Sequence, residues 1–219
     1  MALHLDLEEQ EQVDQLKHFW KQYGNIILWV LIGVFGSIAA VNVWNIWQNR
    51  QAAGASVLFD EVVKAVDSRD AAKVQRAVDD MKDKYGKTLA GQQAVMLGAK
   101  SLSELGKTEQ SMAALTWMAD QAADDAYRDM AKLRLSALLL DKKSFDEALK
   151  RVEEVQLTAF AGLAADRKAD IFMAKGQTAL AKAEYEKAYQ LIPSSDEYRM
   201  LVLAKLNALG GDAPAEGKK

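Results

Sequence analysis

The sequence contains no cysteine, and its two histidines, His4 and His18, both lie near the amino terminus. Without cysteine the chain has no disulfide, no thiol nucleophile and no thiolate metal site. Without histidine after His18, the rest of the chain cannot build a Ser-His-Asp triad, a Cys-His pair or a usual zinc site. Adjacent carboxylates such as Asp79 and Asp80 are typical of solvated helix faces. We therefore expect a non-enzymatic protein with no cofactor and no metal.

Proline and an excess of charge of one sign are also scarce. The 219 residues carry a formal net charge of −3 and include two prolines, Pro193 and Pro214. The near balance of charge excludes the strongly basic surface of a nucleic-acid-binding protein, so no nucleic-acid partner is expected. The length after residue 50 is sufficient for one substantial hydrophobic core.

The most informative absence is that of charge between Lys21 and Arg50. The segment 25–47 within it is long and apolar enough for a transmembrane helix, which needs roughly 20 residues. Tyr23 and Trp44 would lie about 31 Å apart on a helix, as aromatic residues at the two interfaces of a bilayer do. A buried core helix and a cleaved secretory signal are the alternatives. The length of the run and the acidic segment before it favour an uncleaved anchor.

The segment 1–24 is expected to be a cytoplasmic leader with a short amphipathic helix, or else a loosely ordered leader, because so short a helix is marginal alone. Lys17 and Lys21 lie close before the span, whereas Arg50 follows it closely. Lys and Arg favour the cytoplasmic side, so this difference places the amino end inside. Gly24 is expected to interrupt the path between the leader helix and the spanning helix.

Small residues recur within the span at a spacing of four. Such a pattern lets a second helix approach closely, and an asparagine could add an interhelical hydrogen bond. Glycine and alanine are also common in spanning helices in general, so a membrane partner, a dimer and an unpaired helix all stay open. The candidates for helix packing are Gly33, Gly36, Ser37, Ala40 and Asn42.

The segment 48–209 has apolar residues at helical spacing and no long strand-like alternation, which predicts an all-α domain. The neighbourhood of Ala148 recurs further along the chain around Ala181. This recurrence resembles the tetratricopeptide repeat, a helix–turn–helix unit of about 34 residues. We expect a solenoid of helical hairpins, with a non-repeating helical bundle as the alternative, and a disordered tail over 210–219.

Stacked hairpins of this kind form a concave groove. Carrying the repeat pattern along the chain predicts an apolar groove that is partly lined by methionine, whose adaptable side chain suits varied partners. Apolar stripes are more often core than groove, and this alternative stays open for each residue. The predicted client-groove residues are Gln92, Val95, Ala99, Leu102, Met130, Leu133, Ala137, Leu140, Leu163, Asp166, Asp170 and Met173.

The order of these parts resembles one family. An acidic leader that ends in Leu16-Lys-His-Phe-Trp20 precedes one span, and the span ends in Trp44-Asn-Ile-Trp-Gln48. The domain that follows contains Lys84-Tyr-Gly86 and Asp166-Arg-Lys-Ala-Asp-Ile-Phe-Met-Ala-Lys-Gly176. This layout is similar to that of the ancillary subunit of the bacterial Sec translocon, a tetratricopeptide-repeat-like protein of the Gram-negative inner membrane.

The resemblance implies a single-pass protein of the cell inner membrane with a cytoplasmic N-terminus and a periplasmic C-terminal domain. It implies association with the SecYEG translocon and with a periplasmic membrane-anchored isomerase-type chaperone. It further implies chaperone-like help for unfolded secretory or outer-membrane clients, and a link to envelope-stress signalling. The alternative is a membrane-anchored repeat scaffold that assembles another envelope complex, such as the outer-membrane insertion or division machinery.

Overall fold

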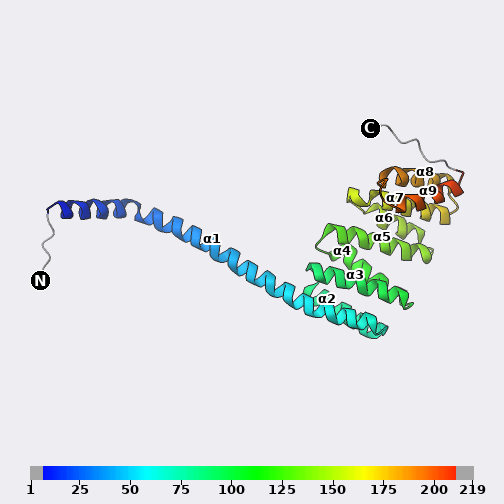
Figure 1. Ribbon diagram of the computed structural model, residues 1–219, viewed down its shortest axis with the longest axis horizontal. Helices are drawn as coiled ribbons and strands as arrows, with labels where there is room; N and C mark the ends of the chain where they lie inside the picture. Colours follow the sequence, from blue (N-terminus) through cyan, green and yellow to red (C-terminus); the bar gives the residue numbers. More distant parts are fainter. Residues whose placement is uncertain (1–6, 211–219) are drawn as a thin grey trace. The chain divides into compact units, whose positions relative to one another are not determined.

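The computed structural model describes residues 7–210, with side chains from Glu11 onward. These residues form helices joined by short turns, and they fall into two units that divide after Gln51 (Figure 1). The predicted all-α fold, an apolar N-terminal helix followed by helical hairpins, is confirmed. The predicted disorder of the tail concerns residues that, apart from Gly210, lie outside the described part of the chain.

The first unit is the greater part of α1, a helix that runs without interruption from Leu7 to Asp67. Gly24 stays within the helix, so the expectation that it separates two helices is wrong, although α1 changes direction in its first half (Figure 1). A glycine inside a helix costs only about 1 kcal/mol, and an apolar segment satisfies its backbone groups best by staying helical. The apolar stretch of α1 is long enough to cross a membrane, and none of it is buried against other described residues.

The second unit begins at Ala52, within α1, and holds the remaining helices. They form antiparallel pairs, α3 with α4, α5 with α6 and α7 with α8, which stack in chain order (Figure 1). The short 3-10 helix η1 leads into α7. The bounds are α2 Ala71–Tyr85, α3 Leu89–Glu104, α4 Thr108–Gln121, α5 Asp125–Asp141, α6 Phe145–Glu153, η1 Thr158–Phe160, α7 Ala161–Ala174, α8 Thr178–Leu191 and α9 Tyr198–Ala208.

Residues with a left-handed backbone follow α1, α3, α5, α7 and α9 in the second unit. These turn residues, with φ between 52° and 74°, are Arg69, Gly106, Lys143, Gly176 and Gly210. At the α3–α4 turn the amide of Lys107 donates to the carbonyl of Leu102 at 2.8 Å, and the next two hairpins repeat this bond. It is the usual way to close the end of a helix. The step from Gly106 to Lys143 is longer than the step from Lys143 to Gly176, so the repeat length varies along the chain.

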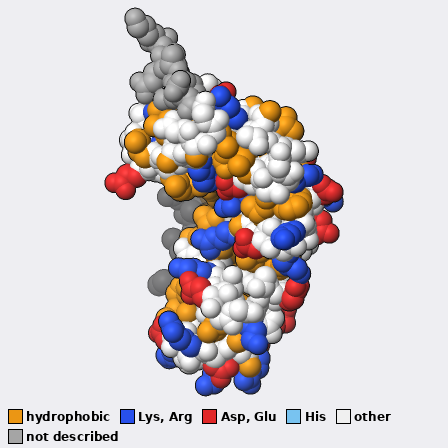
Figure 2. Space-filling view, turned by 90° about the vertical axis from the view of Figure 1, so that its right-hand side faces the viewer, with side chains coloured by type: hydrophobic (Ala, Val, Ile, Leu, Met, Phe, Trp, Pro, Cys, Tyr) orange, Lys and Arg blue, Asp and Glu red, His pale blue; other side chains and the backbone are white. Residues whose placement is uncertain are grey.

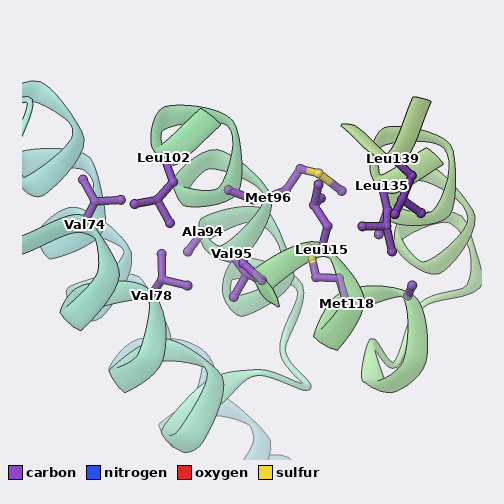
Figure 3. Packing of buried hydrophobic residues seen from close by; sticks show 14 of the residues in the cluster. Val74, Val78, Ala94, Val95, Met96, Leu102, Leu115, Met118, Leu135 and Leu139 are labelled. Carbon is purple, nitrogen blue, oxygen red and sulfur yellow. The ribbon is translucent and has the colours of Figure 1, made fainter. Parts of the chain in front are cut away.

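The hydrophobic core continues from one hairpin to the next. Val74 and Val78 of α2 face Val95 and Leu102 of α3, and all four side chains are completely buried (Figure 3). Gly98 lets these helices pack closely, because a Cβ atom there would lie 2.1 Å from Val78 Cγ2. This cluster reaches from α1 to α7, and a second cluster joins α7, α8 and α9. Stacking thus buries the apolar face that no hairpin could bury alone.

Candidate functional site

A cavity of about 580 Å³ opens in the second unit between α3, α4, α5, η1, α7 and α9. Most of its lining side chains are apolar, and we call these, Leu133 and Leu163 among them, the floor; we call its four charged lining side chains the rim. Figure 2 shows one face of the molecule, on which hydrophobic side chains form small groups among charged ones. We call this cavity the groove; it is lined by Ala99, Lys100, Ser103, Glu104, Ser111, Leu115, Met130, Leu133, Arg134, Ala137, Leu138, Phe160, Leu163, Arg167 and Tyr198.

Some of the predicted groove residues line this cavity, and others do not. Those that line it are Ala99, Met130, Leu133, Ala137 and Leu163. Leu140 is half-buried against the core, and Met173 is 37% exposed on α7 but does not line the groove. Whether any of these side chains contacts a client stays a prediction.

Gln92, Val95 and Leu102 are buried in α3, so the prediction that they face the groove is wrong. Val95 and Leu102 belong to the core between α2 and α3. Gln92 Oε1 accepts a hydrogen bond from the backbone amide of Asp124 at 3.0 Å, which ties the start of α5 to α3. These side chains hold successive hairpins together.

The error is a shift of one residue in register. The prediction equated Gln92 with Met130, and this step is one position longer than the step from Gly106 to Lys143, the turn residues of the same two hairpins. One residue turns a helical side chain by about 100°, which is enough to move it from the groove to the core. With the correct interval, Lys100 is the equivalent of Ala137, and both line the groove. The shift explains only part of the error, because Met96, the equivalent of Leu133, is buried in the core, and Ala99 lines the groove in spite of the shift. Ser103 lines it as well.

The acidic residues predicted on α7 belong to a hydrogen-bond network. Asp166 is 1% exposed and accepts hydrogen bonds from the Tyr198 hydroxyl at 2.7 Å and from Lys205 Nζ at 2.9 Å. Lys205 Nζ and the Tyr185 hydroxyl both donate to Asp170 Oδ1, at 2.8 and 2.6 Å. The prediction that Asp166 faces the groove is wrong, because two side chains of α9 cover it. Asp170 is half-buried in the same network and does not line the groove.

The two phenols of this network are held in the protonated form. Burial raises the pKa of Tyr185, and its hydrogen bond to Asp170 raises the pKa further. Burial and the hydrogen bond to Asp166 raise the pKa of Tyr198 in the same way. Each hydroxyl therefore donates to a carboxylate over the whole physiological range. The network fixes α9 on α7 and positions Tyr198 at the groove.

A second polar cluster fastens the segment before α7 to α5. Asp129 Oδ2 accepts hydrogen bonds from the amides of Gln156 and Leu157 at 2.9 and 2.8 Å. Lys132 Nζ donates to Asp129 Oδ1 at 2.9 Å and to the carbonyl of Glu154 at 2.7 Å. Burial alone would raise the pKa of Asp129, but the hydrogen bonds from Lys132 and the two amides outweigh it and lower the pKa. The charged carboxylate thereby sets the connection between α6 and α7.

The rim of the groove carries the charged side chains Lys100, Glu104, Arg134 and Arg167. Lys100 and Glu104 form an exposed ion pair at 3.7 Å. Arg134 makes no ion pair with any residue from 11 to 210. The prediction from sequence missed these residues because it followed apolar positions. Arg134 and Arg167 precede the turn residues Lys143 and Gly176 by the same interval, and this shared position is the signal that could have found them.

The comparisons with known proteins agree with this architecture. The model of a family described as a tetratricopeptide repeat-like domain matches residues 17–211. Proteins named ancillary SecYEG translocon subunit match over most of their length. The relative from Haemophilus influenzae is 30% identical, over 93% of this chain and 98% of its own. The chain belongs to the ancillary SecYEG translocon subunit family.

Two further members of this family show how much of the chain is shared. The Neisseria gonorrhoeae protein is 27% identical over 95% of this chain and 100% of its own length. The Escherichia coli protein is 26% identical over 81% of this chain and 85% of its own. No solved structure matches the chain. The family predicted from the layout is therefore confirmed, and the match includes the apolar part of α1 as well as the hairpins.

The small residues of α1 leave room for the close approach of a helix from another chain. A Cβ atom added at Gly33 or Gly36 would meet no other described atom within 4 Å. The Ser37 hydroxyl donates to the carbonyl of Gly33 at 2.6 Å, so its polarity is satisfied within the helix. Ala40 and Asn42 are exposed. Their role in helix packing stays a prediction.

Proposed function

We propose that this chain is a non-enzymatic ancillary subunit of the SecYEG translocon. The observation that carries the proposal is the similarity to subunits of that name over nearly the full length of both chains. The groove supports a role in binding, because its lining combines an adaptable methionine with other apolar side chains. The hairpins present this surface together with η1 and α9, which contribute Phe160 and Tyr198.

We propose that α1 anchors the chain in the inner membrane, with the N-terminus in the cytoplasm and the second unit in the periplasm. The apolar stretch of α1 and the name of the relatives support the membrane. Lys17 and Lys21 before the span, against Arg50 after it, support the orientation. Small residues such as Gly33 and Gly36 would then face a helix of the channel.

In this arrangement the groove assists unfolded secretory or outer-membrane proteins as they emerge into the periplasm. A tether raises the effective concentration of a binding site to roughly millimolar, so weak and adaptable contacts suffice. A periplasmic membrane-anchored isomerase-type chaperone would act on the same clients. A link to envelope-stress signalling would respond to the amount of unfolded client protein. These partners follow from the family resemblance alone.

The test is in-cell crosslinking from photoreactive residues at Trp29 and Ser37 on α1, followed by mass spectrometry. Both positions are exposed along the helix. The proposal predicts crosslinks to channel subunits from at least one face of the span. Crosslinks to another envelope complex, with none to SecYEG, would show instead that the chain is a scaffold for that complex.

A further inference from the structure

The groove carries more positive than negative charge. Lys100, Arg134 and Arg167 line it together with Glu104, and Glu104 is paired with Lys100 at 3.7 Å. The two arginines differ in counter-charge, because Arg167 has an ion pair with Asp170 and shares that carboxylate with Lys205. Arg134 makes no ion pair with any residue that the structure describes. Arg167 reaches Asp170 through Nη1 at 3.4 Å, while its Nε is buried without an acceptor among the described residues.

The two arginines also occupy equivalent positions in successive hairpins. Arg134 on α5 and Arg167 on α7 precede the turn residues Lys143 and Gly176 by the same interval. Helices α5 and α7 pack against each other, and packed helices lie about 8–10 Å apart. An unfolded chain often adopts the extended polyproline II conformation, which has three residues per turn and advances about 3.1 Å per residue. Two side chains three positions apart in such a segment point to the same side about 9 Å apart, which matches the separation of the two helices.

We propose that the groove binds an extended apolar segment of an unfolded client that carries two acidic residues three positions apart. The proposal rests on the function proposed above and adds a preference among clients. Apolar side chains of the segment would pack on Leu133 and Leu163 of the floor. Its two carboxylates would bind Arg134 and Arg167, since the planar guanidinium group suits bidentate contact with a carboxylate.

The positive charges of Arg134 and Arg167 also disfavour a segment that carries basic residues. A segment with lysine at the two positions would place like charges beside the arginines, which disfavours binding. A segment with glutamine would keep the apolar contacts and lose only the ionic ones. The order of affinity predicted for one apolar host sequence is therefore glutamate first, glutamine second and lysine last.

The experiment measures fluorescence anisotropy with the full chain in detergent and three short labelled peptides. The peptides share an apolar host sequence and differ at two positions, i and i+3, which hold glutamate, glutamine or lysine. All three are amidated, so no terminal carboxylate contributes. The glutamate peptide should bind about 10-fold more tightly than the glutamine peptide, as expected for two partly exposed charge contacts, and this advantage should shrink with salt.

Variants of the protein show which side chains read the charge. Arg134→Gln and Arg167→Gln should each weaken the glutamate peptide about 3-fold and leave the glutamine peptide unchanged. Arg167→Lys keeps the positive charge and should retain most of the binding of the glutamate peptide. If Arg167→Gln weakens this binding and Arg167→Lys does not, the loss is due to charge and not to disturbed packing. The matched control is Arg76→Gln, an exposed arginine of α2 that does not line the groove.

Equal affinity for the glutamate and glutamine peptides, with no effect of Arg134→Gln, would overturn the charge preference and leave the proposed client binding intact. Binding of none of the three peptides would overturn the preference and the client-binding role of the groove together. A loss of the glutamate peptide caused equally by Arg76→Gln would show a general effect of charge and would overturn the assignment to the groove.

Discussion

Replacing Asp166 with Asn tests whether the buried network holds α9 on α7. The Asp166 carboxylate is 1% exposed and receives the Tyr198 hydroxyl at 2.7 Å and Lys205 Nζ at 2.9 and 3.0 Å. Asparagine has nearly the same shape, and its carbonyl oxygen can still accept the Tyr198 hydroxyl. The substitution therefore mainly removes the charge opposite Lys205.

The size of the effect follows from burial. Removing one partner of a fully buried ion pair costs about 3–5 kcal/mol. Lys205 is 26% exposed and keeps its contact with Asp170 at 2.8 Å, which reduces the loss. A hydrogen bond to a charged group contributes about 1.5–3 kcal/mol. We therefore expect Asp166→Asn to lower the free energy of unfolding of the α7–α9 region by about 2 kcal/mol.

Hydrogen exchange of the full chain in detergent can locate this loss. A change of about 2 kcal/mol corresponds to amide exchange about 30-fold faster in α8 and α9. The control is Asp146→Asn, because Asp146 pairs with Lys175 at 2.9 Å but is 93% exposed. Such a surface pair contributes at most about 1 kcal/mol. Equal exchange rates in the two variants would refute the argument that the buried charge fixes α9.

Further predictions concern the turns and the titrating groups of the second unit. Lys143→Gly should raise the free energy of unfolding by about 0.5–1 kcal/mol, and Gly176→Ala should lower it by about 1 kcal/mol, because a left-handed backbone disfavours a Cβ atom; urea unfolding compares them, and effects of the same sign would contradict this. The raised pKa values of Tyr185 and Tyr198 contribute stability that is complete below the unfolded value of about 10 and is lost as the pH rises above it. Thermal unfolding above about pH 10 should show this loss, and replacing both tyrosines with Phe should flatten it; an unchanged slope would argue against it. The lowered pKa of Asp129 contributes stability that is present above the unfolded value of about 3.9 and is lost as the pH falls below it. Asp129→Asn should therefore destabilise the chain at neutral pH, and its penalty should shrink as the pH falls below about 4; a penalty that does not change with pH would mean that packing, not charge, is responsible.

The fold could be predicted from the sequence because its signals are local. The absence of charge between Lys21 and Arg50 marks the apolar part of α1, and helical spacing marks the hairpins. The uninterrupted course of α1 through Gly24 was not predicted, because a single glycine is a weak helix breaker when its surroundings favour a helix. At such a position the low helix propensity of glycine competes with the helical preference of its apolar neighbours, and the sequence pattern alone does not decide between them.

The groove was harder to predict, because its position depends on register. The interval that places α3 cannot be taken from the clearer repeat that follows it, because the turns at Gly106 and Lys143 lie further apart than those at Lys143 and Gly176. Register does not explain the burial of Asp166. Tyr198 and Lys205 of α9, which lie far along the chain, cover its carboxylate. Contacts of this range leave no periodic signal in the sequence.

Client binding by the groove is tested most directly by in-cell photocrosslinking from the groove itself. A photoreactive residue at Leu133 lies on the groove floor, and one at Lys187, exposed on α8 away from the groove, serves as the control. If the groove binds clients, secreted and outer-membrane proteins are crosslinked from Leu133 and not from Lys187. Crosslinks from Leu133 that stay within its own chain, or the same partners from both positions, would contradict the claim that this groove binds clients.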